Sequence, residues 1–132
     1  MRIGFTSFLA AVLLAGNAIA ETKVYDCAVN SREDSGWIAE HYIFTLDDAT
    51  KQSTAESRHH DAAPVEMKID RKQRYKLTWR ANLSGLSGRH YNMVYRATLN
   101  PAQNTVKIYA KFTNASLGNR PSGSGTCKVI SG

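Results

Sequence analysis

Apolar and polar residues alternate most regularly in residues 91–112, which read YNMVYRATLNPAQNTVKIYAKF. Tyr, Met, Tyr, Ala and Leu take every second position in the first half, and Val, Ile, Ala and Phe do so in the second. A period of two places these side chains on one face of a β-strand. The Asn-Pro-Ala-Gln-Asn sequence between the halves is typical of a turn, because Asn bonds back to turn amides and Pro fixes its own φ. This stretch therefore predicts two antiparallel strands joined by a turn.

The same alternation recurs along the chain, at Tyr25–Val29, Glu40–Leu46, Val65–Asp70, Tyr75–Arg80 and, as a last short strand, Gly125–Ile130. Residues 49–60 are polar and fit either an edge strand or a short helix capped by Asp47 or Asp48. About eight short strands with short turns predict an all-β, eight-stranded antiparallel meander that closes into a small or flattened barrel. The longer loops are expected at Asn30–Gly36, His59–Pro64, Asn82–Gly88 and Asn114–Ser124.

The first 20 of the 132 residues have the pattern of a signal peptide. Arg2 precedes an apolar run at residues 8–15, and Ala18-Ile19-Ala20 is a small-x-small cleavage site. The run is shorter than the roughly 18–20 residues that a membrane-spanning helix needs. We therefore expect cleavage after Ala20, a single β-barrel domain at residues 21–132, and a periplasmic or secreted protein with no integral membrane segment.

The two cysteines, Cys27 and Cys127, lie close to the two ends of this expected domain. A pair of cysteines in an exported chain predicts one disulfide. Closure of an eight-stranded barrel brings the first strand beside the last, which is where the two residues lie. The expected disulfide therefore ties the termini together.

No catalytic signature motif of the GxSxG, HExxH or glycine-rich phosphate-loop kind occurs in the chain. His59-His60-Asp61 is the only histidine cluster, and adjacent residues of a strand point to opposite faces, so the two imidazoles are poorly placed to share a metal. We interpret them as part of a solvated loop before Pro64. The sequence therefore predicts a protein that is not an enzyme, with no cofactor and no metal.

Charge is divided unevenly between the two halves of the expected domain. Residues 21–66 hold ten acidic and four basic side chains, whereas residues 67–132 hold one acidic and twelve basic, a net charge of +11. If Leu77, Trp79, Tyr95, Ile108 and Phe112 point inward, the alternation turns basic side chains of three successive strands outward. The predicted anion-binding residues on this face are Arg74, Lys76, Arg80, Arg96, Lys107, Tyr109 and Lys111.

A face of this kind can bind phosphates or anionic sugars, with the tyrosine as a stacking surface. The alternative is an ordinary solvated sheet surface, because outward strand positions are often charged. Export makes an anionic envelope polymer or a phospholipid headgroup the expected partner. Two small-residue loops, one before Arg89 and one carrying Arg120, could form a binding rim at one end of the barrel.

Tyr25-Asp26-Cys27 near the start and Gly123-Ser124-Gly125-Thr126-Cys127 near the end resemble small exported bacterial β proteins of unknown function. Ser87-Gly88-Arg89-His90-Tyr91 is similar to a Ser-Gly-x-x-Tyr segment of the periplasmic C-type lysozyme inhibitors. That resemblance implies an eight-stranded barrel with a disulfide, and a loop whose serine reaches the active site of a wall-degrading hydrolase. The inhibitory residues would then be Ser87, Gly88, Arg89 and Tyr91. The strong positive charge of the second half suits a basic enzyme poorly, so inhibition is the alternative to anion binding.

Overall fold

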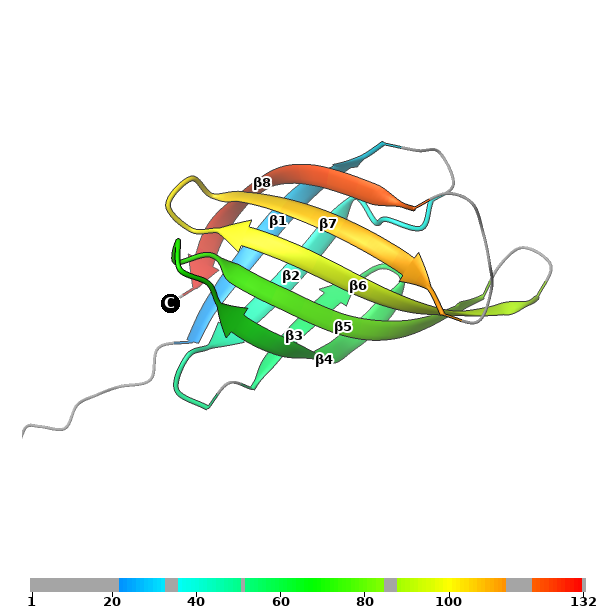
Figure 1. Ribbon diagram of the computed structural model, residues 1–132, viewed down its shortest axis with the longest axis horizontal. Helices are drawn as coiled ribbons and strands as arrows, with labels where there is room; N and C mark the ends of the chain where they lie inside the picture. The colour runs from blue at the N-terminus through cyan, green and yellow to red at the C-terminus, as the bar shows by residue number, and fades with distance from the viewer. Residues whose placement is uncertain (1–21, 33–35, 51, 85–87, 114–119, 132) are drawn as a thin grey trace, which may run out of the picture.

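Eight antiparallel strands make up the described part of the computed structural model, which covers residues 22–32, 36–50, 52–84, 88–113 and 120–131. They are β1 (Thr22–Ser31), β2 (His41–Asp47), β3 (Ser53–Ser57), β4 (His60–Ile69), β5 (Tyr75–Ser84), β6 (His90–Asn100), β7 (Thr105–Phe112) and β8 (Ser122–Ser131). Each strand pairs with the next, and β8 pairs with β1, so the sheet is a closed barrel (Figure 1). The predicted meander barrel is confirmed. The signal-peptide prediction, residues 1–20, lies outside the described residues.

The inside of the barrel is filled by the alternating apolar side chains. Leu77, Trp79, Tyr95, Ile108 and Phe112 are all buried, as the sequence predicts. The Trp79 and Tyr95 rings stack with their centroids 5.4 Å apart. Burying one large apolar side chain stabilises the fold by about 1.5–3 kcal/mol. This inward set determines which residues face outward, because a shift of one residue would reverse both faces.

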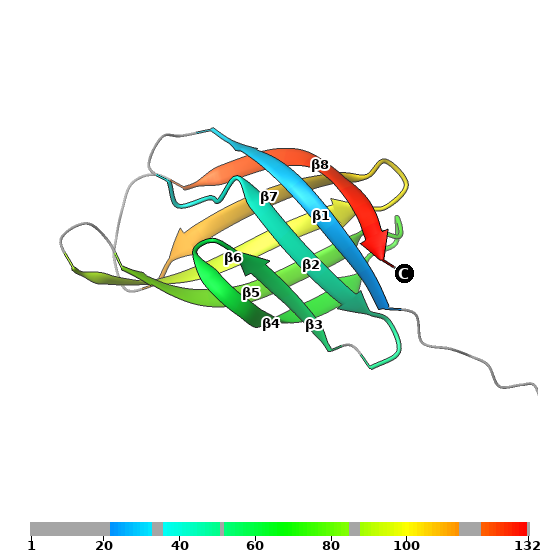
Figure 2. The same cartoon turned by 180° about the vertical axis from the view of Figure 1, so that it is seen from behind.

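The barrel closes where the first strand meets the last. Cys27 lies directly opposite Cys127 in the β1–β8 register, and the two are joined by a disulfide. Both views of the barrel show β1 beside β8 (Figure 2). Gly125 pairs with Val29 in the same register, and a Cβ atom at Gly125 would lie 1.8 Å from the carbonyl oxygen of Ala28. The predicted disulfide is therefore confirmed, and the adjoining strand backbones are closely packed.

Of the two alternatives for residues 49–60, the strand is correct over Ser53–Ser57, where β3 lies, and the described residues of this segment form no helix. The Asp47 carboxylate accepts hydrogen bonds from the backbone N–H groups of Ala49 and Thr50 and so stabilises a turn. β3 follows and pairs with β2 on one side and with β4 on the other. Ser53 and Ala55 are buried, so small side chains fill the inward positions of this short strand. β3 is an interior strand and not the edge strand that the sequence suggested, because the closed barrel leaves it no free side.

The expected loop His59–Pro64 is also wrong, since β4 already begins at His60. Pairing with β3 continues through Ala63 and Pro64, with a register irregularity between Ala55 and Ser57. The expected loops Asn82–Gly88 and Asn114–Ser124 are too long, because β5 runs to Ser84 and β8 begins at Ser122. Pairing with an adjacent strand supplies the hydrogen-bonding partners that make these polar segments strands.

The turns that begin with Asp or Asn lie together at one end of the barrel. In each, the side chain of Asp47, Asp70 or Asn100 accepts backbone hydrogen bonds from the turn that follows. The described residues that bound the β5–β6 and β7–β8 connections lie at the other end, as expected for a meander: Ser84, His90, Phe112 and Ser122. Within the described ranges, no helix has the length and apolarity that a membrane span requires.

Candidate functional site

The outward side of β5, β6 and β7 carries most of the predicted anion-binding residues. We call this surface the basic face and define it by Lys76, Arg80, Arg96, Lys107, Tyr109 and Lys111, all of which are exposed. They lie outside the barrel because their sequence neighbours are the buried residues of the same strands. The structure thus brings six of the seven predicted residues onto one surface.

Strand register sets which members of the basic face are neighbours. Arg96 on β6 lies directly opposite Thr78 on β5 and Tyr109 on β7. Residues directly opposite one another in an antiparallel pair have Cβ atoms about 4.5–5.5 Å apart. The guanidinium-bearing residue and the tyrosine are therefore adjacent near the middle of the face.

Two further rows of side chains flank this central pair. In one row, Val94 lies between Arg80 and Lys111, so an apolar side chain separates two cations. In the other row, Thr98 lies between Lys76 and Lys107. The Nζ of Lys76 donates a hydrogen bond to Thr98 Oγ1 over 3.2 Å.

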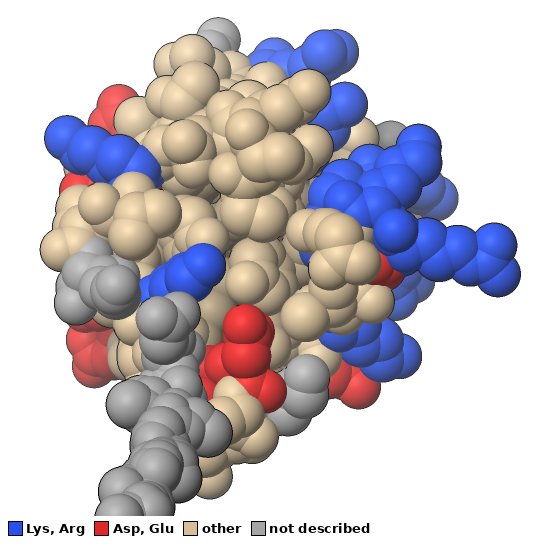
Figure 3. All heavy atoms as spheres, turned by 90° about the vertical axis from the view of Figure 1, so that its left-hand side faces the viewer, with Lys and Arg blue, Asp and Glu red and all other residues tan. Residues whose placement is uncertain are grey.

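Carboxylates are absent from the strands that form this face. The sequence contains no Asp or Glu after Asp70. Among the described residues, the ion pairs within 4.0 Å are His41–Asp26, Arg58–Glu40 and Arg74–Asp70, and none includes a member of the basic face. Figure 3 shows most Lys and Arg side chains gathered on one side of the barrel, which is the side that faces the viewer in Figure 1. The cations of the face are thus free of carboxylate partners in this part of the chain.

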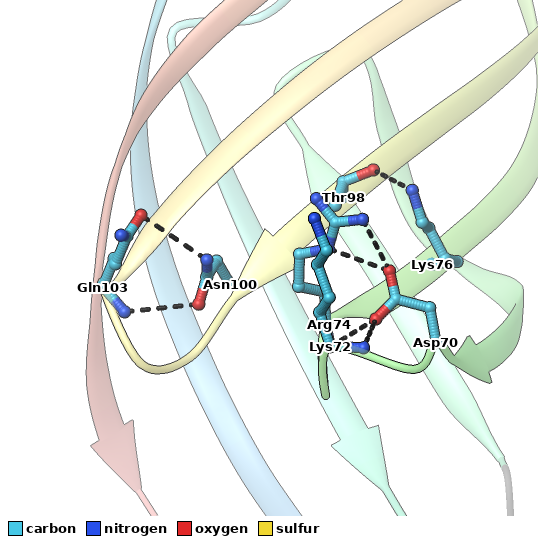
Figure 4. A network of polar contacts seen from close by, with 7 residues as sticks. All are labelled: Asp70, Lys72, Arg74, Lys76, Thr98, Asn100 and Gln103. Carbon is cyan, nitrogen blue, oxygen red and sulfur yellow. Dashed lines mark hydrogen bonds and ion pairs between the residues drawn. The ribbon is translucent and has the colours of Figure 1, made fainter.

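Arg74 is the predicted residue that does not join the face. It lies in the β4–β5 turn, where its guanidinium nitrogens lie 2.8 Å from Asp70 Oδ2 (Figure 4). Asp70 also accepts hydrogen bonds from the backbone N–H groups of Lys72 and Arg74. These backbone bonds, chiefly the one from Arg74, together with the guanidinium lower the pKa of the Asp70 carboxyl. The charge of Arg74 therefore stabilises a turn.

A shallow cavity of about 310 Å³ lies on the β6–β7 half of the basic face. Its described lining consists of Val94, Arg96, Tyr109, Ala110, Lys111 and Arg120. Arg120 comes from the segment before β8, which the chain holds against β7 through a 2.9 Å hydrogen bond from Ala110 N–H to the carbonyl of Pro121. The predicted anion-binding set omitted Arg120, which the sequence placed only on a loop that could form a binding rim. Its sequence signal is weak, because a cation in a loop has no alternation to place it.

The residues of the alternative inhibitory segment are only partly described. Ser87 lies outside the described residues, and Gly88 adopts a φ of 79°. The guanidinium carbon of Arg89 lies 5.6 Å from the ring centroid of Tyr91. Tyr91 in turn packs edge-on against Trp37 and Phe112, with centroids 5.2 and 5.8 Å away. Tyr91 thus belongs to an aromatic cluster at this end of the barrel.

The hairpin that carries this segment extends past its neighbours. The last β4 residue paired with β5 is Glu66, opposite Thr78, whereas β5 continues to pair with β6 as far as Ser84 and His90. On the other side, β7 pairing with β6 ends at Met93. The end of the β5–β6 pair therefore projects beyond the barrel, as Figure 1 shows.

The two histidines of the predicted solvated loop are in different environments. His60 lies on β4, and its Nε2 accepts a hydrogen bond from the indole N–H of Trp79 over 3.2 Å. His59 Nε2 is buried and has no hydrogen-bond partner among the described residues, and burial lowers the pKa of the imidazole. The solvated-loop interpretation is therefore wrong for both, since His60 is part of a strand and the Nε2 atom of His59 is buried. The described residues contain no group of three His, Cys, Asp or Glu side chains placed to hold a metal ion.

No protein-family model, curated protein or solved structure matches the chain. The resemblance to exported β proteins and to lysozyme inhibitors therefore stays a prediction from the sequence. The geometry of the chain itself provides the basis for the functional argument.

Proposed function

We propose that the protein is an exported, non-enzymatic binding protein that takes up an anionic envelope component on its basic face. The observation that carries this proposal is a set of cations with no carboxylate partner in the described chain, arranged over three paired strands beside a cavity. Paired strands fix the backbone positions of these residues, so only their side chains have to be ordered on binding. A polymer of phosphates or carboxylates, or a phospholipid headgroup, has the matching charge.

The energetics of such a face depend on salt. Each cation that contacts a polyanion releases condensed counterions, an effect that in nucleic acids contributes about 0.7–0.9 per contact to the fall of log affinity with log salt concentration. Exposed charges are also screened over about 10 Å at 0.1 M ionic strength. Binding through the basic face should therefore weaken steeply as salt is added.

The test uses residues 21–132 with Arg80, Arg96 and Lys107 changed to Glu. Binding to labelled polygalacturonate and to vesicles with and without an anionic phospholipid would be measured by anisotropy and co-sedimentation across a salt series. The variant should lose binding to both, while its thermal unfolding should shift little because exposed substitutions usually cost under about 0.5 kcal/mol each.

The matched control changes three exposed cations outside the face, Arg58, Arg71 and Lys128, to Glu. The net charge change is the same, so this variant should keep most of the binding. Equal losses in both variants would mean that net charge alone attracts the polymer. Salt-insensitive binding, or none by the unmodified domain, would refute the proposal.

A second candidate function is inhibition of a wall-degrading hydrolase through Ser87, Gly88, Arg89 and Tyr91. The projecting end of the β5–β6 hairpin favours it, because a protruding segment can enter an active-site cleft. Ser87→Ala should abolish inhibition of lysozyme in a wall-lysis assay and leave polygalacturonate binding unchanged. Unaltered lysis rates with the unmodified protein present would eliminate this candidate.

A further inference from the structure

We infer that the cavity on the β6–β7 half of the basic face recognises a sugar residue that carries a carboxylate or phosphate group. The inference rests on the proposed anion-binding function and specifies its ligand. It comes from the combination of an exposed aromatic ring, an apolar side chain and three cations in one small site.

The Tyr109 ring is exposed on the basic face. Tyr109 is 55% exposed, and it is the one Phe, Tyr or Trp at the outward positions of β5–β7. The Arg89–Tyr91 contact is the cation–π pair found among the described residues, so no guanidinium covers Tyr109 there. An exposed ring with an open face is a stacking surface.

The cavity is lined by both apolar and cationic side chains. Val94 and the Tyr109 ring supply apolar surface, while Arg96, Lys111 and Arg120 supply positive charge. An inorganic phosphate chain would use the cations and leave the apolar surface unused. A neutral sugar would stack its C–H face on the ring and leave three cations unmatched. A sugar with an acidic substituent uses both kinds of surface.

Nucleic acid is another ligand that combines rings with negative charge. Proteins that bind single strands stack successive bases on several aromatic side chains. The outward positions of β5–β7 offer one Phe, Tyr or Trp ring, that of Tyr109, and the His90 ring at the start of β6 does not line the cavity. One ring in a cavity of about 310 Å³, at the lower end of the usual range for ligand sites, fits a single sugar unit better.

Arg96 is the cation placed to bind the acid group of the sugar. It lies directly opposite Tyr109, so an acid group on a stacked sugar would meet the guanidinium. Guanidinium binds carboxylate and phosphate through two parallel hydrogen bonds, whereas an ammonium group acts as a point charge. Three cations of the basic face do not line the cavity, namely Lys76, Arg80 and Lys107. They would attract an anion without contacting the sugar in the cavity.

The experiment compares four small probes on residues 21–132 by calorimetry at fixed salt: trigalacturonate, glucose 6-phosphate, tripolyphosphate and maltotriose. The two sugar anions distinguish carboxylate from phosphate as the group that is recognised. At least one of them should bind more tightly than tripolyphosphate and maltotriose. Tyr109→Ala should weaken that binding about tenfold, the size expected when one stacking ring is removed. Tyr109→Phe should not weaken it.

Arg96→Lys distinguishes the specific hydrogen bonding of the guanidinium from general electrostatic attraction. This variant keeps the charge, so its salt dependence should not change, but its affinity for the sugar anion should fall. Lys128→Gln, which removes an exposed charge outside the face, is the control and should leave the ranking of the probes intact. Unaltered affinity in Arg96→Lys would overturn the assignment of Arg96.

The failures can be told apart. Tripolyphosphate bound as tightly as both sugar anions, with no effect of Tyr109→Ala, would overturn the sugar inference and leave anion binding standing. Tighter binding of a thymidine trinucleotide than of either sugar anion would also overturn it. No binding of any anionic probe, together with no binding of polygalacturonate, would refute the proposed function itself.

Discussion

Asp70 stabilises the β4–β5 turn through both of its carboxylate oxygens. Oδ1 accepts the backbone N–H groups of Lys72 and Arg74 at 2.9 Å, and Oδ2 accepts Arg74 Nε at 2.8 Å. Because these contacts lower the folded-state pKa below the ordinary value of 3.8, the stabilisation is full above that value and is lost as the pH falls through the folded pKa.

We therefore expect Asp70→Asn to unfold at lower urea concentration than the unmodified protein at about pH 7, with a smaller difference at about pH 2. Urea midpoints at the two pH values measure this. Asp61→Asn, which changes an exposed carboxylate on β4, is the control and should shift the midpoint little. A difference that stays constant between the two pH values would contradict the role of the Asp70 charge.

His59 places a titratable ring where it is poorly solvated. Burial lowers the pKa of its imidazole below the ordinary value of 6.5, and Nε2 lacks a hydrogen-bond partner in the described part of the chain. The unfolded state therefore takes up a proton first, so stability should decrease as the pH falls through 6.5 and level off below the folded pKa.

His59→Asn should reduce this loss, because an amide can still hydrogen-bond while the unsatisfied Nε2 is removed. An unsatisfied buried polar atom costs about 1–3 kcal/mol, so the variant should equal or exceed the unmodified protein in stability near pH 5. Thermal midpoints from about pH 8 to pH 5 would show it. The other three histidines are common to both proteins, so parallel profiles would assign the pH dependence to them.

At the scale of elements, the β1–β8 seam depends on a glycine. Gly125 has no room for a Cβ atom, which would lie 1.8 Å from the Ala28 carbonyl oxygen. Gly125→Ala must push β8 away from β1, so we expect a loss of about 1–3 kcal/mol, the usual cost of overpacking. Chemical denaturation would measure it against Ser124→Ala, an exposed neighbour on the same strand. Equal stability of the two variants would show that the seam relaxes freely.

The order and register of β5, β6 and β7 produce the basic face. β5, β6 and β7 are consecutive strands, so the outward cations of each lie beside those of the next. Antiparallel register then pairs Arg96 with Tyr109 and places Val94 between two cations. The face is a consequence of strand order and register together.

At the scale of the molecule, the disulfide joins the two strands that close the barrel. It links residues 100 positions apart. In the chain-entropy model a loop of this length gives up to about 4.7 kcal/mol, and removing a native bridge from a small secreted domain typically costs 2–5 kcal/mol. Replacing Cys27 and Cys127 together with Ala should destabilise the protein within that range, measured by urea unfolding. No difference from the oxidised protein would contradict a stabilising role of the bridge.

Much of the fold is determined by the sequence through local rules. The period of two in residues 91–112 predicts two strands and their buried faces, because neighbouring side chains of a strand must point opposite ways. The same rule predicts that Trp79 is buried and Arg96 exposed, as the structure shows. The position of Cys27 and Cys127 near the ends predicts the bridge. Six residues of the basic face follow from the same alternation.

The remaining features depend on contacts that the alternation along one strand does not specify. Residues 53–57 and 60–64 are strands because β3 and β4 pair with each other and β3 pairs with β2 on its other side. Arg74 leaves the face because its turn brings Asp70 within reach. Arg120 enters the cavity because β8 returns beside β7. Local alternation determines on which side of a strand a residue lies, whereas register and closure determine which residues become its neighbours.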